Sequence, residues 1–203
     1  DFGSSARAYW TFKVFGHKDV SILDGGFAGW QTTYPEQIET GPFIAPEVGD
    51  FIAQFKPGLY IGTEDVANYV NNPGDAVLVD SRNTGQFYAE AKHPKAAKAG
   101  RIPSAILMSQ AHAYADDSNR LKSRDELEDI YDDLDDKTIV SYCNTGHWAA
   151  TNWFVISEVL GLENVRFYDG SMVEWTAHSD LPLDSSGMSN MDKLKKLMGD
   201  LLG

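Results

Sequence analysis

The amino-acid sequence predicts an α/β fold built on a parallel β-sheet. Three short runs rich in apolar and β-branched residues, 76–80, 138–142 and 165–168, carry this prediction. None alternates strictly between apolar and polar side chains, as half-exposed antiparallel strands do. Helical stretches separate the runs, and strands that alternate with helices form parallel sheets covered by helices on both faces. We therefore expect a three-layer domain with a central parallel sheet.

The composition limits the partners that the chain can bind. Among 203 residues there are 17 Lys and Arg against 30 Asp and Glu, a net charge of −13. This charge repels nucleic-acid phosphates and anionic lipid, so neither nucleic acid nor a membrane is an expected partner. No segment approaches the roughly 20 apolar residues that span a bilayer, and the first residues do not resemble a signal peptide. The sequence leaves the compartment undecided between cytoplasm and periplasm.

Cysteine and histidine usage argues against a disulfide and against a metal centre. Cys143 is the only cysteine, so the chain can form neither an internal disulfide nor a CxxC pair nor a cysteine-rich zinc site. The histidines show no HxH or HExxH spacing. They are His17, His93, His112, His147 and His178. The sequence therefore predicts no metal site.

One segment of the sequence recurs late in the chain. Residues 19–30 match residues 164–175 at a constant offset of 145. The equivalent pairs are Gly16 and Gly161, Asp24 and Asp169, and Trp30 and Trp175. The repeat predicts two homologous units, with an equivalent tryptophan in the core of each.

Residues 1–33 correspond to the second half of such a unit. They predict a helix over residues 4–15, a strand over 20–23 and a short helix that ends near Trp30. A segment this short cannot bury a core by itself. We expect it to be a partial second copy of the domain that packs on the second unit, on a missing N-terminal fragment of the same protein, or on both.

Composition places the remaining boundaries. Residues 34–60 are rich in proline and glycine and lack sustained periodicity, which predicts a linker. Residues 61–183 contain the predicted sheet and form the second unit. Residues 184–203 predict an amphipathic helix that docks on the protein. Its apolar positions are Met191, Leu194, Leu197, Met198, Leu201 and Leu202.

The most informative segment surrounds Cys143. The predicted strand 138–142 ends directly before it, and a helix that runs to Gly161 follows a short loop with one glycine. The thiol therefore lies at the carboxyl end of a parallel strand and the amino end of a helix, where open α/β folds bind their ligands. The helix dipole and free backbone N–H groups there favour anions, so they stabilise a thiolate and a negatively charged adduct. Such a site suits a thiolate that attacks a sulfane sulfur and carries it as a persulfide.

Two other interpretations of Cys143 are less favoured. A lone cysteine is commonly a small buried apolar residue, but the strand–loop–helix context indicates chemistry. A cysteine phosphatase needs an arginine six positions after the cysteine to hold the phosphoryl group, and that position is Ala149.

Four ordered motifs resemble the rhodanese family of sulfurtransferases. They are residues 79–82 (Val-Asp-Ser-Arg), residues 100–105 (Gly-Arg-Ile-Pro-Ser-Ala), the cysteine loop 143–149, and residues 168–175 (Tyr-Asp-Gly-Ser-Met-Val-Glu-Trp). The resemblance covers nearly the whole chain. The second unit resembles the catalytic domain of a two-domain member, and residues 1–33 resemble half of its non-catalytic domain.

The resemblance implies a cofactor-free transfer of sulfur from thiosulfate or 3-mercaptopyruvate to cyanide or another thiol. It implies that Cys143 is the nucleophile. It also implies that backbone N–H groups of the loop surround the bound sulfur. The substrate-binding residues expected on this basis are Asn144, Thr145, Gly146, His147, Trp148 and Arg82, although in the family this arginine mostly braces the loop by ion pairing.

The sequence departs from the family where cations are expected. Mammalian members bind the substrate anion with an arginine four positions after Arg82, and this chain has Gln86 there. Thiosulfate-selective members carry basic residues at the second and third loop positions, where this chain has Asn144 and Thr145. A basic stretch either supplies the missing charge or is simply solvated. Its members are Lys92, His93, Lys95 and Lys98.

The predicted activity is therefore that of a thiosulfate sulfurtransferase that works through a Cys143 persulfide, with a small sulfur donor and a thiol or cyanide acceptor as partners. Two alternatives stay open. A 3-mercaptopyruvate sulfurtransferase is one, because the hydroxyl of Thr145 resembles a serine found in those enzymes. A persulfide carrier loaded by a protein donor is the other, because the loop lacks cations.

Overall fold

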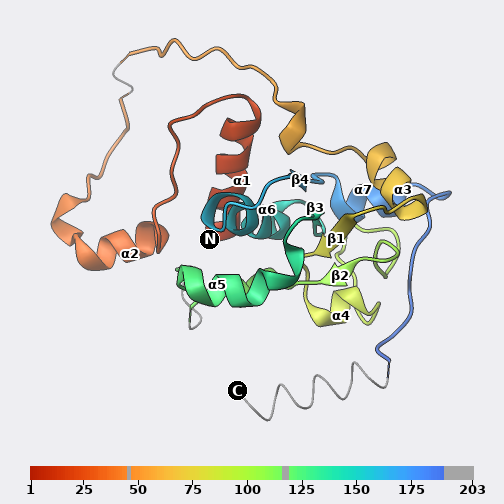
Figure 1. Cartoon of the computed structure of the whole chain (residues 1–203). Coiled ribbons are helices and arrows are strands. Elements are labelled where there is room, and N and C mark those ends of the chain that lie inside the picture. The colour runs from red at the N-terminus through yellow and green to blue at the C-terminus, as the bar shows by residue number, and fades with distance from the viewer. Residues whose placement is uncertain (45–46, 116–118, 190–203) are drawn as a thin grey trace.

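A parallel β-sheet forms the centre of the fold. The computed structural model describes residues 1–44, 47–115 and 119–189, and Figure 1 gives the arrangement of their elements. In this part of the chain the strands are β1 (Ala76–Asp80), β2 (Ile106–Leu107), β3 (Thr138–Tyr142) and β4 (Val165–Phe167), in the order β2-β1-β3-β4. All neighbouring pairs are parallel. The predicted α/β class, its parallel sheet and all three predicted strands are confirmed.

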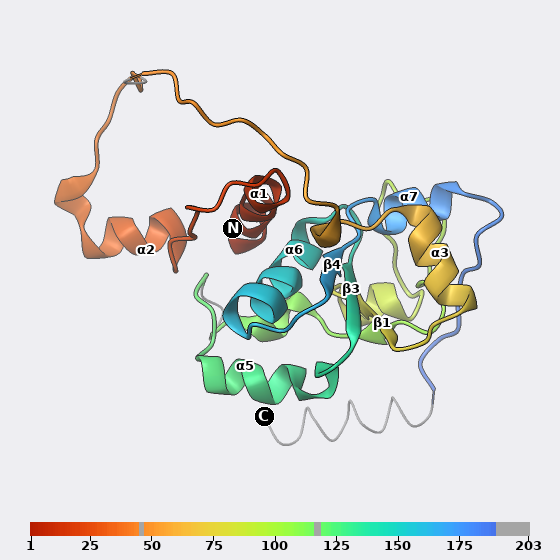
Figure 2. The same ribbon diagram turned by 45° about the horizontal axis from the view of Figure 1, so that its top comes forward.

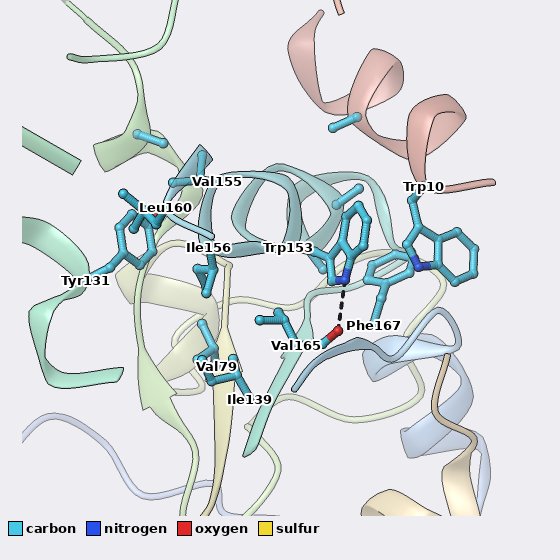
Figure 3. Close-up of a cluster of buried hydrophobic side chains, with 14 of the residues drawn as sticks. Trp10, Val79, Tyr131, Ile139, Trp153, Val155, Ile156, Leu160, Val165 and Phe167 are labelled. Atoms are coloured by element: carbon cyan, nitrogen blue, oxygen red, sulfur yellow. Dashed lines mark hydrogen bonds between the residues drawn. The ribbon is translucent and has the colours of Figure 1, made fainter. Parts of the chain in front are cut away.

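Helices cover both faces of the sheet (Figures 1 and 2). The α-helices of the described residues are α1 (Phe2–Val14), α2 (Gly26–Thr33), which lies apart from the sheet, α3 (Thr63–Asn71), α4 (Thr84–Phe87), α5 (Arg124–Tyr131), α6 (His147–Phe154), which continues as a π-helical turn over Val155–Val159, and α7 (Ser171–Ala177). Successive strand residues point to opposite faces, so Val79 packs in the cluster with α1, α5 and α6, and Leu78 in the cluster with α3 and α7. In the first cluster the indole N–H of Trp153 donates to the carbonyl of Val165 at 3.2 Å (Figure 3).

The N-terminal helix α1 packs directly on α6. Its first turn is capped by Asp1, whose carboxylate accepts the N–H of Ser4 at 2.9 Å. Tyr9 lies edge-to-face against Phe154, with ring centroids 4.9 Å apart. The α1 side chains buried in the first cluster are Phe2, Ala6, Tyr9, Trp10 and Val14. Because each large apolar side chain buried contributes about 1.5–3 kcal/mol, α1 is held firmly on the unit that carries Cys143.

Two predictions for residues 1–33 are wrong. Residues 20–23 form no strand, because none of the strands in the described residues lies beside them to take up their backbone hydrogen bonds. Trp30 is not a core residue, since α2 buries no side chain and lies away from the sheet in both views. Its repeat equivalent Trp175, by contrast, is 1% exposed under the sheet. An amphipathic helix buries its apolar face only where another layer covers it, and no sheet in the described chain covers α2.

The described residues of the segments 34–60 and 184–203 are mostly irregular. Among the described residues of 34–60 there are two short 3-10 turns, Pro35–Gln37 and Pro57–Leu59, and no longer element. The end of this segment is tied to α1, because the N–H groups of Gln54 and Lys56 donate to the carbonyls of Phe15 and Val14 at 2.8 and 2.7 Å. Residues 184–189 are not helical, and the rest of the predicted C-terminal helix lies outside the described residues. Within those residues no helix is long and apolar enough to cross a membrane.

Candidate active site

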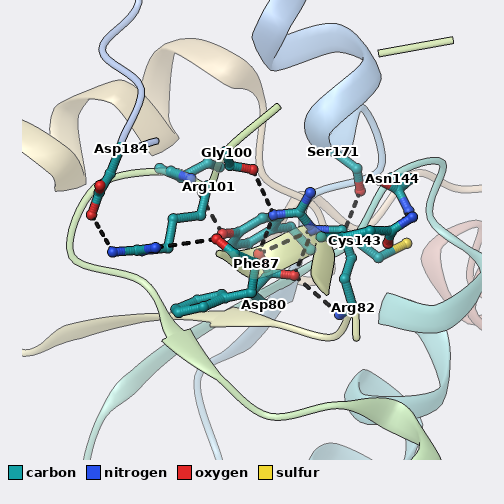
Figure 4. A network of polar contacts seen from close by, with 12 residues as sticks. Asp80, Arg82, Phe87, Gly100, Arg101, Cys143, Asn144, Ser171 and Asp184 are labelled. Carbon is teal, nitrogen blue, oxygen red and sulfur yellow. Dashed lines mark hydrogen bonds and ion pairs between the residues drawn. The ribbon is translucent and has the colours of Figure 1, made fainter. Parts of the chain in front are cut away.

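Cys143 lies where the chain leaves the sheet. It follows β3 directly, and α6 begins at His147. The residue is 2% exposed. Its sulfur accepts the N–H of Gly146 at 3.2 Å, and its own N–H donates to Oγ of Ser171 at 3.0 Å (Figure 4). An N–H that points at the sulfur stabilises a thiolate more than a thiol, because hydrogen bonds to charged groups are the stronger ones.

The start of α7 holds the loop from its other side. The N–H groups of Met172 and Val173 donate to the carbonyls of Cys143 and Asn144 at 3.0 and 3.1 Å. With these carbonyls bonded to α7, the loop keeps a fixed shape that leaves the N–H of Gly146 for the sulfur. Ser171 was not predicted to contact Cys143, although it lies within the motif 168–175 that the repeat and the family resemblance both single out.

Gly146 makes the turn between the sulfur and α6. Its φ of 88° lies in the left-handed region, which L side chains rarely adopt. A Cβ placed on it would lie 2.7 Å from Nη1 of Arg7 and 2.8 Å from Oδ1 of Asp169. Only glycine therefore fits this position without moving its neighbours. Neither Arg7 nor Asp169 was predicted to approach the loop, because Arg7 is 136 or more residues and Asp169 is 20 or more residues away from it in sequence.

A cavity of about 210 Å³ opens beside the sulfur. It is lined by His93, Cys143, Asn144, Thr145, His147 and Trp148. The structure thus brings together the predicted loop residues except Gly146, which is buried and does not line the cavity, and His147 and Trp148 are exposed at the rim. Of the basic stretch only His93 is among the lining residues, and the stretch's three lysines are exposed. No lysine or arginine is among the described residues that line this cavity.

Asn144 and Gln86 meet at the edge of the cavity. The Asn144 amide donates through Nδ2 to Oε1 of Gln86 at 3.0 Å. Asn144 is 4% exposed, and its Oδ1 is buried without a hydrogen-bond partner among the described residues. Gln86 stands where the mammalian relatives of the resembled family carry an arginine, so two neutral amides occupy a place where that family puts positive charge.

Arg82 lies beneath the site and is not a lining residue of the cavity. It is 2% exposed, and its guanidinium donates to both carboxylate oxygens of Asp80 and to the carbonyl of Gly100, the latter at 2.8 Å (Figure 4). Burial by itself lowers the pKa of Arg82, but the hydrogen bonds and the charge of Asp80 outweigh it, so the pKa stays raised. The arginine is therefore positioned to brace β1 against the Gly100 loop, and its predicted contact with substrate has no support in this geometry.

The fold is thus a parallel α/β fold, and Cys143, the only cysteine of the sequence, lies in the loop between β3 and α6. A family model described as the Rhodanese-like domain matches residues 63–178. Since this match covers more than half of the chain, the protein belongs to the rhodanese-like family.

Relatives named as sulfurtransferases extend the match beyond that domain. A putative thiosulfate sulfurtransferase of Saccharopolyspora erythraea is 33% identical, over 89% of this chain and 66% of its own length. The 3-mercaptopyruvate sulfurtransferase of Escherichia coli (strain K12) is 34% identical, over 89% of this chain and 64% of its own length. The crystal structure of SseA from Escherichia coli, described among 3-mercaptopyruvate sulfotransferases, superposes with a TM-score of 0.71 at 32% identity, over 84% of this chain and 63% of that one. The chain thus spans slightly less than two thirds of the length of these relatives.

Proposed function

We propose that the protein is a sulfurtransferase that moves sulfane sulfur from thiosulfate, through a persulfide on Cys143, to cyanide or another thiophilic acceptor. The observation that carries the proposal is the N–H of Gly146 directed at the Cys143 sulfur, at the base of a cavity formed by the loop. The thiolate carries its negative charge on Sγ, so this donor stabilises the attacking state of the cycle.

The cycle consists of two displacements at sulfur. The Cys143 thiolate attacks the outer sulfur of thiosulfate, an S–S bond forms to Sγ, and the bond to the inner sulfur breaks so that sulfite leaves with the electron pair. Cyanide then attacks the terminal sulfur of the persulfide, the S–S bond breaks, and thiocyanate leaves while the thiolate is restored. In this scheme the loop residues Asn144–Trp148 bind the donor, and no metal or organic cofactor takes part.

The charge around the cavity affects small anionic donors and a protein donor differently. Thiosulfate and 3-mercaptopyruvate are both anions, and relatives named for each activity match this chain at similar identity. The neutral Asn144–Gln86 pair weakens the attraction for either anion, which supports the second candidate, a persulfide carrier loaded by a protein donor. His93 and His147 are the titratable groups that line the cavity besides the thiol.

Intact mass spectrometry tests the proposal. Treatment with thiosulfate is expected to add the mass of one sulfur atom, and cyanide is expected to remove it with release of thiocyanate. Parallel reactions with thiosulfate and 3-mercaptopyruvate at equal concentration assign the donor. Rapid loading by a cysteine desulfurase, without loading by either small molecule, would select the carrier function. The absence of an adduct with every donor would contradict sulfur transfer altogether.

Restoring a cation beside the loop should improve the use of an anionic donor. We expect Gln86→Arg to lower the KM for thiosulfate by about fivefold with little change in kcat, because one added charge at a partly solvated site contributes about 1 kcal/mol. Steady-state kinetics with varied thiosulfate measure this effect. Gln86→Met is the matched control, since it removes the amide contact to Asn144 without adding charge. An equal effect of both variants on KM would show that charge is not the cause.

The N-terminal segment belongs, in this proposal, to a partial second copy of the domain. Two correspondences at the repeat offset of 145 support it. Helix α1, Phe2–Val14, corresponds to residues 147–159, which are α6 and its π-helical turn. Gly16 and Gly161 stop the two helices with φ values of 89° and 80°. We expect a longer chain that completes this copy to cover the exposed apolar side chains of α2.

A further inference from the structure

An arginine of α1, Arg7, lies against Gly146 of the cysteine loop. Arg7 lies on the face of α1 that packs toward β4 and forms an ion pair with Asp169, two residues after the end of β4. Its guanidinium stacks on the rings of Trp10 and Phe167, at 4.9 and 5.1 Å from their centroids. An arginine held by two aromatic faces and a carboxylate is fixed in position, because its planar group satisfies all of these contacts in a single orientation.

The pair touches the residue that donates to the catalytic sulfur. The position that a Gly146 Cβ would occupy is 2.7 Å from Arg7 Nη1, 2.8 Å from Asp169 Oδ1 and 3.1 Å from the Phe167 ring. These atoms fill the space on one side of the Gly146 backbone. The Cys143 sulfur accepts the N–H of Gly146, at 3.2 Å from the nitrogen. Gly146 is thereby held between the ion pair and the sulfur.

We infer that the Arg7–Asp169 pair is a positioning device that keeps the N–H of Gly146 on the Cys143 sulfur, so that α1 sets the reactivity of the thiol. Only the expected effect on turnover rests on the proposed sulfur transfer. The expected effect on the reactivity of the Cys143 thiol does not, because alkylation measures that reactivity without a sulfur donor. Arg7 is a positioning residue, since it is not among the residues that line the cavity.

The chain offers a matched control on the same helix. Lys13 of α1 pairs with Glu158 at 3.4 Å, and its side chain is 29% exposed, compared with 25% for Arg7. Both pairs join α1 to the second unit. Lys13 lies in the last turn of α1, six residues after Arg7, and Glu158 lies in the π-helical turn after α6. The loss of this pair therefore reports the general effect of weakening the interface.

Alkylation kinetics test the inference, because the only cysteine of the chain is the one in the loop. We expect Arg7→Met and Asp169→Asn each to slow alkylation of Cys143 by iodoacetamide about tenfold, since the hydrogen bond that favours the thiolate is weakened. The kcat for sulfur transfer should fall by a similar factor with KM little changed. Arg7→Lys should restore part of the rate, because an ammonium group pairs with Asp169 but lacks the planar group that stacks. Lys13→Met should stay within about twofold of the parent.

Each outcome decides for or against the inference. Equal effects of Arg7→Met and Lys13→Met would overturn it, because the loss would then be a general one of the interface. Unchanged alkylation in both Arg7→Met and Asp169→Asn would overturn it as well. If circular dichroism shows that Arg7→Met does not fold, Asp169→Asn and Arg7→Lys carry the decision. The two proposals can also fail separately. If Arg7→Met and Asp169→Asn slow alkylation but the parent protein takes up sulfur from no donor, the inference is supported and the proposed function is contradicted.

Discussion

Replacing Cys143 with serine is expected to abolish persulfide formation and to lower turnover by roughly 10³-fold or more, as loss of a nucleophile does in other covalent mechanisms. The substitution changes one atom of a side chain that is 2% exposed, so the cavity and the loop should keep their shape. An alcohol at neutral pH is a far weaker nucleophile than a thiolate, and the Gly146 N–H cannot compensate for that difference.

The measurement for Cys143→Ser combines intact mass with turnover of thiosulfate and cyanide. The parent protein should gain one sulfur atom, and the variant none. The thermal unfolding midpoint serves as the control, and it should change little because the substitution is nearly isosteric. Cys143→Ser has no cysteine, because the sequence contains only one. Sulfur uptake by this variant would therefore place the sulfur on another kind of atom and refute the assignment of Cys143.

Breaking the buried pair beneath the site should have the largest effect on stability. Arg82→Met is expected to lower the free energy of unfolding by about 3–5 kcal/mol, because it leaves the Asp80 carboxylate buried without an opposite charge. Asp80 is 0% exposed, and its Oδ2 lies 2.6 Å from Nη2 of Arg82. The same guanidinium holds the carbonyl of Gly100, so the loop after that residue should also loosen.

Urea denaturation of Arg82→Met measures this loss, with the slope checked for two-state behaviour. Glu128→Gln is a control, because it breaks an ion pair of 52–57% exposed side chains that contributes about 0.5 kcal/mol or less. The double variant Asp80→Leu/Arg82→Met should recover a large part of the lost stability, because no unpaired charge remains. A loss for Arg82→Met as small as that for Glu128→Gln would mean that the pair does not stabilise the fold.

Much of the sheet that carries Cys143 could be predicted from local sequence. Strands β1 and β3 are apolar runs bounded by helices, and their ends were predicted at the residues where the structure has them. Residues 20–23 carry a similar apolar run but form no strand. A run of this kind reports a tendency to be buried and extended, whereas a strand also needs a neighbour for its N–H and C=O groups.

The sequence by itself determined that Cys143 stands between a strand and a helix in a loop with one glycine. This much is local, because the strand, the glycine and the helix are each encoded within a few residues. Only the tertiary structure decided what surrounds the loop. It places Arg7 and Asp169 behind Gly146 and buries Arg82 on Asp80.

The contacts of Arg7 join segments far apart in the chain and depend on how α1 packs on α6. Asp80 and Arg82 are two residues apart, but the fold decides that they are buried and that the Gly100 carbonyl meets the guanidinium. An arginine is free to be solvated, paired at a surface or buried, and its sequence neighbours do not distinguish these states. The free energy of each state depends on the carboxylates and rings that the fold brings to it. The proposed nucleophile could therefore be picked out from the sequence, and the residues that surround its loop could not.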